Sequence, residues 1–304
     1  MKVLLLTFLM LFSLNSYGSR KTNFVLSDFE ATLSPTDKAA ILMVHFGTTY
    51  EKTRKETIET INEKVKQTFP RFEVREAYSS RIVLRRLKKQ GILKDTPIDA
   101  LLKLRGDGYT HILVQSTNCI EGIEMEALRR EVATVSSFFK EIRVGTPLLY
   151  DAADAQKVAS ILAKRYENKG EVVLVGHGTY TPATATYAMM DYIFNVEGYT
   201  HFHVSTIEGY PTFETLLTQL KRTKAKHLTL VPFMLVAGNH AHNDIAGDWK
   251  EALEKEGYQV TVVLEGLGQV PEIQDLFIEH LHFIIKHRMV DIIQKKARYA
   301  KETD

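Results

Sequence analysis

The feature that most constrains the fold is a regular alternation of short apolar runs with amphipathic stretches, which begins at Ala39. Apolar runs of this length between helical patterns predict buried parallel strands. The stretch from Tyr50 to Thr68, for example, is predicted to be a helix because Ile58, Ile61 and Val65 fall on one of its faces. Strands that alternate with helices in this way predict an α/β protein with mostly parallel sheets.

The second half of the chain repeats the pattern of the first. Residues 41–48 read Ile-Leu-Met-Val-His-Phe-Gly-Thr, and residues 172–179 read Val-Val-Leu-Val-Gly-His-Gly-Thr. Residues 101–114 and 216–231 also match, since each joins a leucine-containing helical stretch to an apolar run. This duplication predicts two similar lobes, each a mostly parallel sheet flanked by helices, with a ligand cleft between them.

The pattern divides the chain into five parts. We expect a signal peptide over residues 1–18, a linker over 19–38, an N-terminal lobe over 39–148, a C-terminal lobe over 149–270, and a final helix and tail over 271–304. The final helix is amphipathic, and the sequence leaves open whether it crosses back over the first lobe.

The first residues are typical of an export signal. A minimal basic start precedes the apolar stretch from Val3 to Leu14, and Ser16-Tyr-Gly then supplies small residues for cleavage. The apolar stretch is too short to span a bilayer comfortably. We therefore expect a cleaved signal, Ser19 as the first mature residue and a periplasmic protein; an uncleaved membrane anchor is the alternative.

Net charge and cysteine content limit the kinds of protein that this chain can be. The formal net charge of +2 argues against a dedicated nucleic-acid binder. Cys119 is the only cysteine, which excludes an internal disulfide, and a small buried hydrophobic role is favoured over a catalytic one.

Three apolar runs in the second half each lead to one side chain that can bind a metal: His177, Glu208 and His240. Because parallel strands end at the same edge of a sheet, we expect these side chains to meet there. Two imidazoles and a carboxylate suit a divalent transition metal that keeps open coordination positions. A single histidine at a strand end is more often a hydrogen-bonded loop residue, but three such residues in succession favour a metal site.

Five motifs, in order and with similar spacing over about residues 39–279, resemble the anaerobic, ATP-independent sirohydrochlorin cobalt chelatases. The motifs are Val44-His-Phe-Gly-Thr-Thr, Glu76-Ala-Tyr-Ser-Ser-Arg, Gly176-His-Gly-Thr, Glu208-Gly-Tyr-Pro and Ala237-Gly-Asn-His-Ala-His-Asn-Asp. The resemblance implies a chelatase-like fold and a metal-inserting lyase of cobalamin biosynthesis. It also implies that His177, Glu208 and His240 hold the metal, and that a tetrapyrrole lies above it between the lobes. Co²⁺ is the expected metal, with Fe²⁺, Ni²⁺ and Zn²⁺ as alternatives.

The same motifs suggest which residues contact the tetrapyrrole. We expect His45, Tyr78, Gly178 and His242 to do so, with His45 either lining the pocket or contacting the bound ligand axially. His242 is expected to line the pocket rather than to bind the metal. The sequence departs from the family pattern at His45, where a serine is common, and in the loop after Gly178, which lacks a further histidine.

Metal insertion requires that two pyrrole N–H protons leave the macrocycle while a partly desolvated metal waits at one of its faces. Histidine can bind a metal and can also accept a proton near neutral pH, so His177 or His240 could take these protons. Glu208 balances the charge of the cation and is a second candidate base.

Two other functions remain open on the sequence. Secreted proteins similar to this family are associated with haem binding and iron acquisition, so the protein could carry haem or remove its iron. A bilobed solute-binding protein is a third hypothesis, weakened because it would not need the metal ligands. The expected partner is thus sirohydrochlorin or haem, and the chain could also form a homo-oligomer.

Overall fold

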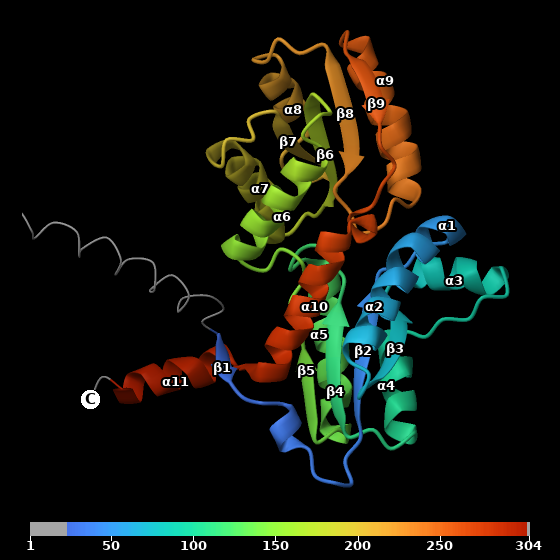
Figure 1. The fold of residues 1–304 in the computed structure, drawn as a ribbon, viewed down its shortest axis with the longest axis vertical. Helices are drawn as coiled ribbons and strands as arrows, with labels where there is room; N and C mark the ends of the chain where they lie inside the picture. Colours follow the sequence, from blue (N-terminus) through green and yellow to red (C-terminus); the bar gives the residue numbers. More distant parts are fainter. Residues whose placement is uncertain (1–22, 303–304) are drawn as a thin grey trace, which may run out of the picture.

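The computed structural model of this protein describes residues 23–302, and the predicted signal segment 1–18 lies outside them. Two α/β lobes are stacked along the long axis of the molecule (Figure 1). Each lobe is built on a four-stranded parallel sheet. The predicted fold class is therefore confirmed.

The two sheets have the same strand order. The N-terminal sheet runs β3-β2-β4-β5, and the C-terminal sheet runs β7-β6-β8-β9. The strands are β2 (Ala39–His45), β3 (Glu73–Tyr78), β4 (His111–Ser116), β5 (Glu141–Val144), β6 (Glu171–Gly178), β7 (Phe202–Glu208), β8 (His227–Pro232) and β9 (Gln259–Val262). The order matches strand for strand when β2 is aligned with β6, as the duplicated sequence predicts.

Helices cover both faces of each sheet. In the N-terminal lobe they are α1 (Glu51–Arg54), η2 (Lys55–Glu59), α2 (Thr60–Thr68), α3 (Arg81–Lys89), α4 (Pro97–Gly106), α5 (Ile123–Val135) and η3 (Ser136–Phe138). In the C-terminal lobe they are α6 (Ala152–Arg165), η4 (Pro182–Thr184), α7 (Ala185–Val196), α8 (Phe213–Leu220), η5 (Ala241–Trp249), α9 (Lys250–Lys255) and η6 (Leu267–Gln269). Side-chain oxygens cap four of them, at Ser80, Thr96, Asp151 and Thr212, which explains where these helices begin.

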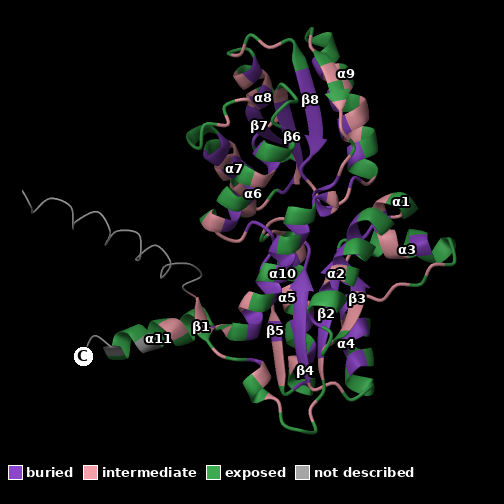
Figure 2. Ribbon diagram, in the orientation of Figure 1, coloured by how far each residue is buried: buried purple, intermediate pink, exposed green. Residues whose placement is uncertain are grey.

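The central strands are apolar on both faces because both faces are covered (Figure 2). In β2, Ile41 and Met43 pack with one layer of helices, whereas Leu42 and Val44 pack with the other. The first of these clusters continues into the C-terminal lobe through Leu162 of α6. The two lobes therefore share part of one hydrophobic core.

The last long helix, α10 (Pro271–Lys286), returns to the N-terminal lobe (Figure 1). Its Phe277 packs in the same cluster as Ile41. Buried Arg143 of β5 donates hydrogen bonds to the carbonyls of Ile284 and Ile285, at 2.8 and 3.2 Å. The end of a helix leaves such carbonyls without partners in the helix; Arg143 supplies a donor to Ile284, and Arg143 and the backbone N–H of Phe29 both donate to Ile285, which holds α10 against the N-terminal lobe.

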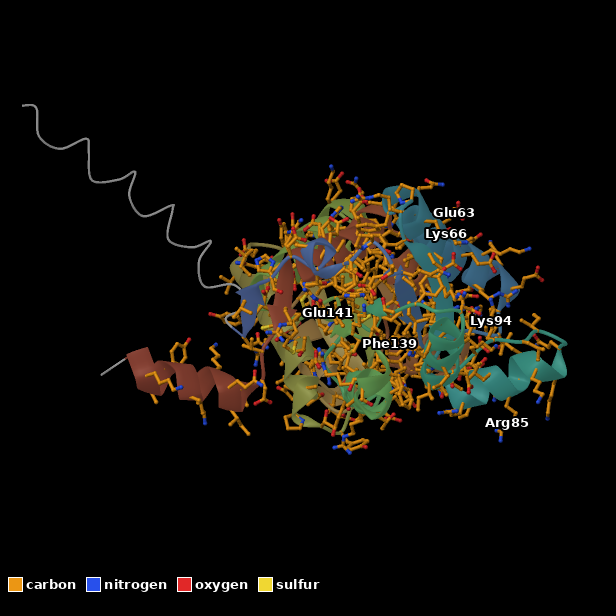
Figure 3. The ribbon with its side chains drawn as sticks, turned by 90° about the horizontal axis from the view of Figure 1, so that it is seen from below. Glu63, Lys66, Arg85, Lys94, Phe139 and Glu141 are labelled. Carbon is orange, nitrogen blue, oxygen red and sulfur yellow. The ribbon has the colours of Figure 1, made fainter. Side chains whose placement is uncertain are left out.

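The described ends of the chain lie side by side. β1 (Phe24–Leu26) pairs antiparallel with β10 (His287–Met289), which is followed by α11 (Ile292–Glu302), and η1 (Glu30–Thr32) follows β1. Part of the predicted linker 19–38 is thus a strand, because its pairing partner comes from the far end of the chain. Viewed from below, α3 and α11 project from opposite sides of the body (Figure 3). Over residues 23–302, no helix combines the length and apolar character that crossing a membrane requires.

Candidate metal centre

The carboxyl ends of both sheets face the boundary between the lobes (Figure 1). The segment after β8 lies on the N-terminal lobe there. Thr53 of α1 donates a hydrogen bond to the carbonyl of Ala237 at 3.4 Å, and the Tyr50 ring stacks on the His242 ring with centroids 4.7 Å apart. The loop that carries the predicted ligand His240 is therefore held between the two lobes.

His177 lies near the end of β6 and is partly buried. Its Nδ1 atom is 3.1 Å from the carbonyl oxygen of Gly178. A carbonyl oxygen can only accept a hydrogen bond, so Nδ1 carries the proton in this arrangement. The lone pair of Nε2 is then available to a metal ion or a proton.

His240 is oriented in a similar way, from the residue that precedes η5. Its Nδ1 atom is 2.6 Å from Oδ2 of Asp244. The carboxylate accepts this hydrogen bond, which leaves the Nε2 lone pair of His240 available. A carboxylate behind a histidine is a common arrangement at metal sites, where it fixes the ring and raises its basicity. Asp244 was not predicted to be part of the site, although residues four apart on a helix, such as His240 and Asp244, lie on the same face.

The rings of His177 and His240 contact each other edge to face, with centroids 4.5 Å apart and planes 83° apart. Two of the three predicted ligands, from different strand ends, are therefore brought together. Each histidine has its Nδ1 atom occupied by an oxygen acceptor, so the two rings offer the same kind of nitrogen.

The third predicted ligand, Glu208, ends β7 and is exposed. Its backbone is opposite Gly178, so Ile207 is opposite His177. Because side chains alternate between the two faces of a strand, regular pleating directs Glu208 and His177 to opposite faces. Across the described part of the chain, no three or more His, Cys, Asp and Glu side chains are grouped to hold a metal. The predicted convergence is thus present for the histidines, while Glu208 stays a predicted ligand whose side chain must turn toward them.

Gly178 has a backbone role in the structure, and its contact with the tetrapyrrole stays a prediction. Its φ angle is +84°, and a Cβ atom built on it would lie 1.5 Å from the carbonyl oxygen of Glu208. Only glycine permits this approach. It allows the ends of β6 and β7 to lie close together and so sets the spacing of His177 and Glu208.

The structure corrects the expectation that His45 contacts the tetrapyrrole. His45 is fully buried, with Nδ1 2.9 Å from Oγ1 of Thr117 and Nε2 2.9 Å from Oδ1 of Asn62. The Asn62 amide donates to Glu76, so its oxygen faces His45 and accepts from Nε2–H. Burial lowers the pKa of His45 to about 4. Both nitrogens are used within the lobe, and the neutral ring is part of the core.

Tyr78, which was also predicted to contact the tetrapyrrole, lies in the core instead. It is fully buried, and its ring packs so closely on Gly47 that a Cβ atom there would lie 2.4 Å from a ring carbon. Burial raises the pKa of its hydroxyl. His242, by contrast, is exposed, follows His240 by two residues and stacks on Tyr50 of the N-terminal lobe; its contact with a tetrapyrrole stays a prediction.

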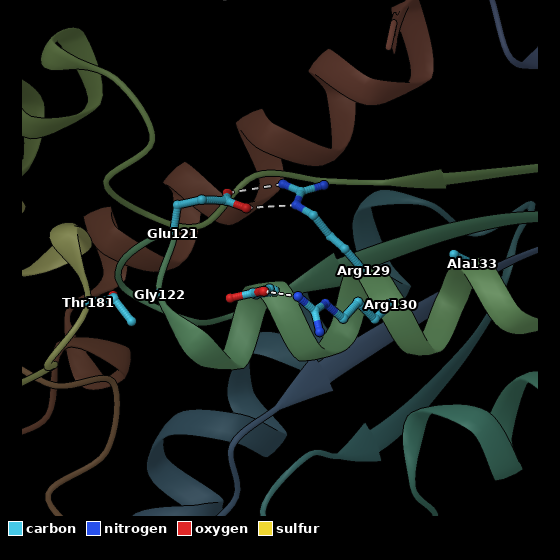
Figure 4. A pocket seen from close by; sticks show the side chains of 7 residues that line it. Glu121, Gly122, Arg129, Arg130, Ala133 and Thr181 are labelled. Carbon is cyan, nitrogen blue, oxygen red and sulfur yellow. Dashed lines mark hydrogen bonds and ion pairs between the residues drawn. The ribbon is translucent and has the colours of Figure 1, made fainter. Parts of the chain in front are cut away.

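A groove of about 450 Å³ lies where the two lobes meet (Figure 4). It is lined by Glu121, Gly122, Glu126, Arg129, Arg130 and Ala133 of the N-terminal lobe and by Thr181 of the C-terminal lobe. Glu121 and Arg129 are joined by an ion pair across it. Thr181 lies four residues after His177, in the loop that follows β6, so this loop of the C-terminal lobe forms part of the groove wall.

Comparison with known proteins gives a consistent result. Residues 39–286 match the family of cobalt chelatases described as CbiK. The sirohydrochlorin cobaltochelatase of Salmonella typhimurium is 34% identical over 253 residues, covering 81% of this chain and 96% of the relative. Sirohydrochlorin cobaltochelatase CbiKC of Nitratidesulfovibrio vulgaris is 33% identical over 264 residues, covering 81% and 90%.

The fold is similar to that of SirB from Bacillus subtilis, solved with Fe³⁺. The TM-score is 0.59 at 16% identity, covering 82% of this chain and 96% of SirB. A second SirB structure, from Bacillus subtilis subspecies spizizenii and described as a sirohydrochlorin chelatase in complex with cobalt, has a TM-score of 0.58 at 16% identity, covering 82% and 95%. At this identity the likeness establishes the two-lobed fold.

Proposed function

This chain belongs to the CbiK cobalt chelatase family, and we propose that it inserts Co²⁺ into sirohydrochlorin without ATP. The observation that carries the proposal is the contact between His177 and His240 at the carboxyl edge of the C-terminal sheet. Each ring offers an Nε2 lone pair on the side away from its own hydrogen bond. Such a pair binds a divalent metal while leaving coordination positions for the macrocycle nitrogens.

Insertion exchanges two protons for one divalent cation. As the macrocycle nitrogens bind the metal ion, the bonds between the metal and the two histidines, His177 and His240, break. The Nε2 lone pairs released in this way can take the two protons that leave the pyrrole nitrogens. Glu208, once turned toward the histidines, balances the charge of the waiting cation and is an alternative base. Asp244 keeps the His240 ring aimed at the metal throughout, because it holds the opposite nitrogen.

Purified protein mixed with Co²⁺ and sirohydrochlorin tests the proposal through the change in the tetrapyrrole absorption spectrum. We expect His177→Ala and His240→Ala to abolish insertion while sirohydrochlorin binding is largely kept. Glu208→Gln should retain the shape, weaken Co²⁺ binding and slow proton removal. His227→Ala is the matched control, since His227 is exposed and begins β8 at the opposite edge of the sheet. Insertion at the wild-type rate by all three site variants would place the active site elsewhere.

Metal choice and the haem alternative can be settled in the same assay. Fe²⁺, Ni²⁺ and Zn²⁺ are offered in place of Co²⁺, and we expect Co²⁺ to give the highest rate. Haem is offered in place of sirohydrochlorin. Tight haem binding by a protein that inserts no metal would replace the chelatase proposal with a haem-handling function.

We propose further that the protein acts in the periplasm after its signal peptide is removed. The support is the apolar stretch from Val3 to Leu14 and the small residues that follow it. Mass spectrometry of protein recovered from its native cell should find an N-terminus near Ser19. An intact Met1 would contradict cleavage.

A further inference from the structure

We propose that Tyr180 and Tyr210 form an aromatic platform that holds one face of the macrocycle beside the metal. The proposal rests on the proposed function and names residues that position its substrate. Tyr180 follows His177 by three residues, and Tyr210 follows Glu208 by two. Both tyrosines are therefore placed by the same strand ends that carry predicted metal ligands.

Both side chains are exposed to solvent. Tyr180 is 84% exposed and Tyr210 is 50% exposed. What distinguishes them from other exposed rings is their position, directly after the strand ends that carry predicted metal ligands, where their faces are free to stack on a ligand. The opposing carboxyl edge of the N-terminal sheet also ends in an exposed ring, Phe46 after β2. Exposed rings thus flank the lobe boundary from both sides.

Hydrogen bonds tie the two tyrosine-bearing loops into one unit. The hydroxyl of Thr184 accepts from the backbone N–H of Tyr210 at 2.9 Å and donates to its carbonyl at 3.0 Å. Gly209 comes so close to the other loop that a Cβ atom on it would lie 2.5 Å from the carbonyl oxygen of Thr179. Thr181, the residue after Tyr180, lines the groove between the lobes, so the two linked loops lie beside this groove (Figure 4).

This construction suits a flat, largely apolar ring with a polar rim. A tyrosine ring stacks on an extended π system, while its hydroxyl stays in water. Because the platform is fixed to the ends of β6 and β7, a macrocycle resting on it takes a defined position relative to His177. The tyrosines would thus contribute to binding and orientation of the macrocycle, and the histidines to the metal.

The test separates macrocycle binding from metal binding. Tyr180→Ala and Tyr210→Ala are titrated with metal-free sirohydrochlorin by absorbance, and separately with Co²⁺ alone by calorimetry. We expect each variant to raise the dissociation constant for sirohydrochlorin about tenfold, as the loss of one stacking partner predicts, and to leave Co²⁺ affinity unchanged. Tyr180→Phe and Tyr210→Phe should bind as wild type does. KM for sirohydrochlorin should rise more than kcat falls.

Tyr192→Ala is the matched control, because Tyr192 is 68% exposed on α7 of the same lobe. Thr184→Val tests the link between the loops and should weaken sirohydrochlorin binding although both tyrosines remain. If wild type inserts Co²⁺ and the tyrosine variants bind sirohydrochlorin as Tyr192→Ala does, the platform is wrong and the chelatase function stands. If wild type neither binds sirohydrochlorin nor inserts Co²⁺, both proposals fail.

Discussion

The buried imidazole of His45 should make the stability of the N-terminal lobe depend on pH. Its pKa is lowered from about 6.5 to about 4 because burial disfavours the charged ring. Above pH 6.5 the ring is neutral in both folded and unfolded chains, and the full stability is present. As the pH falls below 6.5 the unfolded chain binds a proton that the folded chain does not bind, so stability is lost down to about pH 4.

The size of the effect follows from the two pKa values. At about 1.4 kcal/mol per pKa unit, the difference corresponds to about 3 kcal/mol in the free energy of unfolding. About 2 kcal/mol of this should be lost by pH 5, where the unfolded ring is almost fully protonated. Full burial leaves no solvent to screen the effect.

Urea unfolding at pH 7, 6 and 5 measures this loss, and His45→Gln isolates the part due to His45. The glutamine amide can replace both hydrogen bonds, to Thr117 and Asn62, without titrating. We expect the wild type to lose about 2 kcal/mol more than His45→Gln between pH 7 and pH 5, and His227→Gln to follow the wild type. Equal losses in wild type and His45→Gln would refute a neutral buried His45.

Three further substitutions test the roles assigned to single residues. Asp244→Ala should lower Co²⁺ affinity about tenfold or more, measured by calorimetry, because it frees the His240 ring to rotate; unchanged affinity would remove Asp244 from the site. Gly178→Ala should lower the free energy of unfolding by about 2 kcal/mol or more, since its Cβ atom would overlap a carbonyl oxygen, whereas Gly247→Ala, which meets no atom within 4 Å, should be tolerated in thermal unfolding. Arg143→Ala should cost about 2 kcal/mol in urea unfolding because the buried carbonyl of Ile284 loses its donor, whereas that of Ile285 keeps the backbone N–H of Phe29; a loss near zero would mean that Arg143 does not help to hold α10.

The strand pattern and the duplication were readable in the sequence because they depend on local periodicity and burial. The apolar run 40–44 predicts β2, and the helical stretch 50–68 corresponds to α1, η2 and α2 in one continuous helix. The apolar run that leads to His240 spans residues 227–236, but the strand β8 stops at Pro232 and the remaining apolar residues form a loop. An apolar loop that packs between two lobes looks like a strand when only hydrophobicity is considered.

Contacts between segments that are far apart in the chain could not be predicted from the sequence. Nothing in residues 19–38 indicates that Phe24 begins a strand, because its partner Met289 comes from the other end of the chain. The contact between α10 and the first sheet was equally undetermined, although the amphipathic pattern of α10 required some apolar surface to cover it.

The two histidines of the duplicated motif show most clearly what the sequence determines and what only the tertiary structure determines. The sequence by itself placed His45 and His177 at the ends of equivalent strands, because strand periodicity and the parallel arrangement fix where a strand-end side chain emerges. Only the tertiary structure determined how far each histidine is buried and which atoms it contacts. Thr117 and Asn62 close over His45 and use both its nitrogens, whereas His177 meets His240 and keeps one nitrogen available. The physical reason is that burial and hydrogen-bond partners come from segments distant in the chain, which a local pattern does not encode.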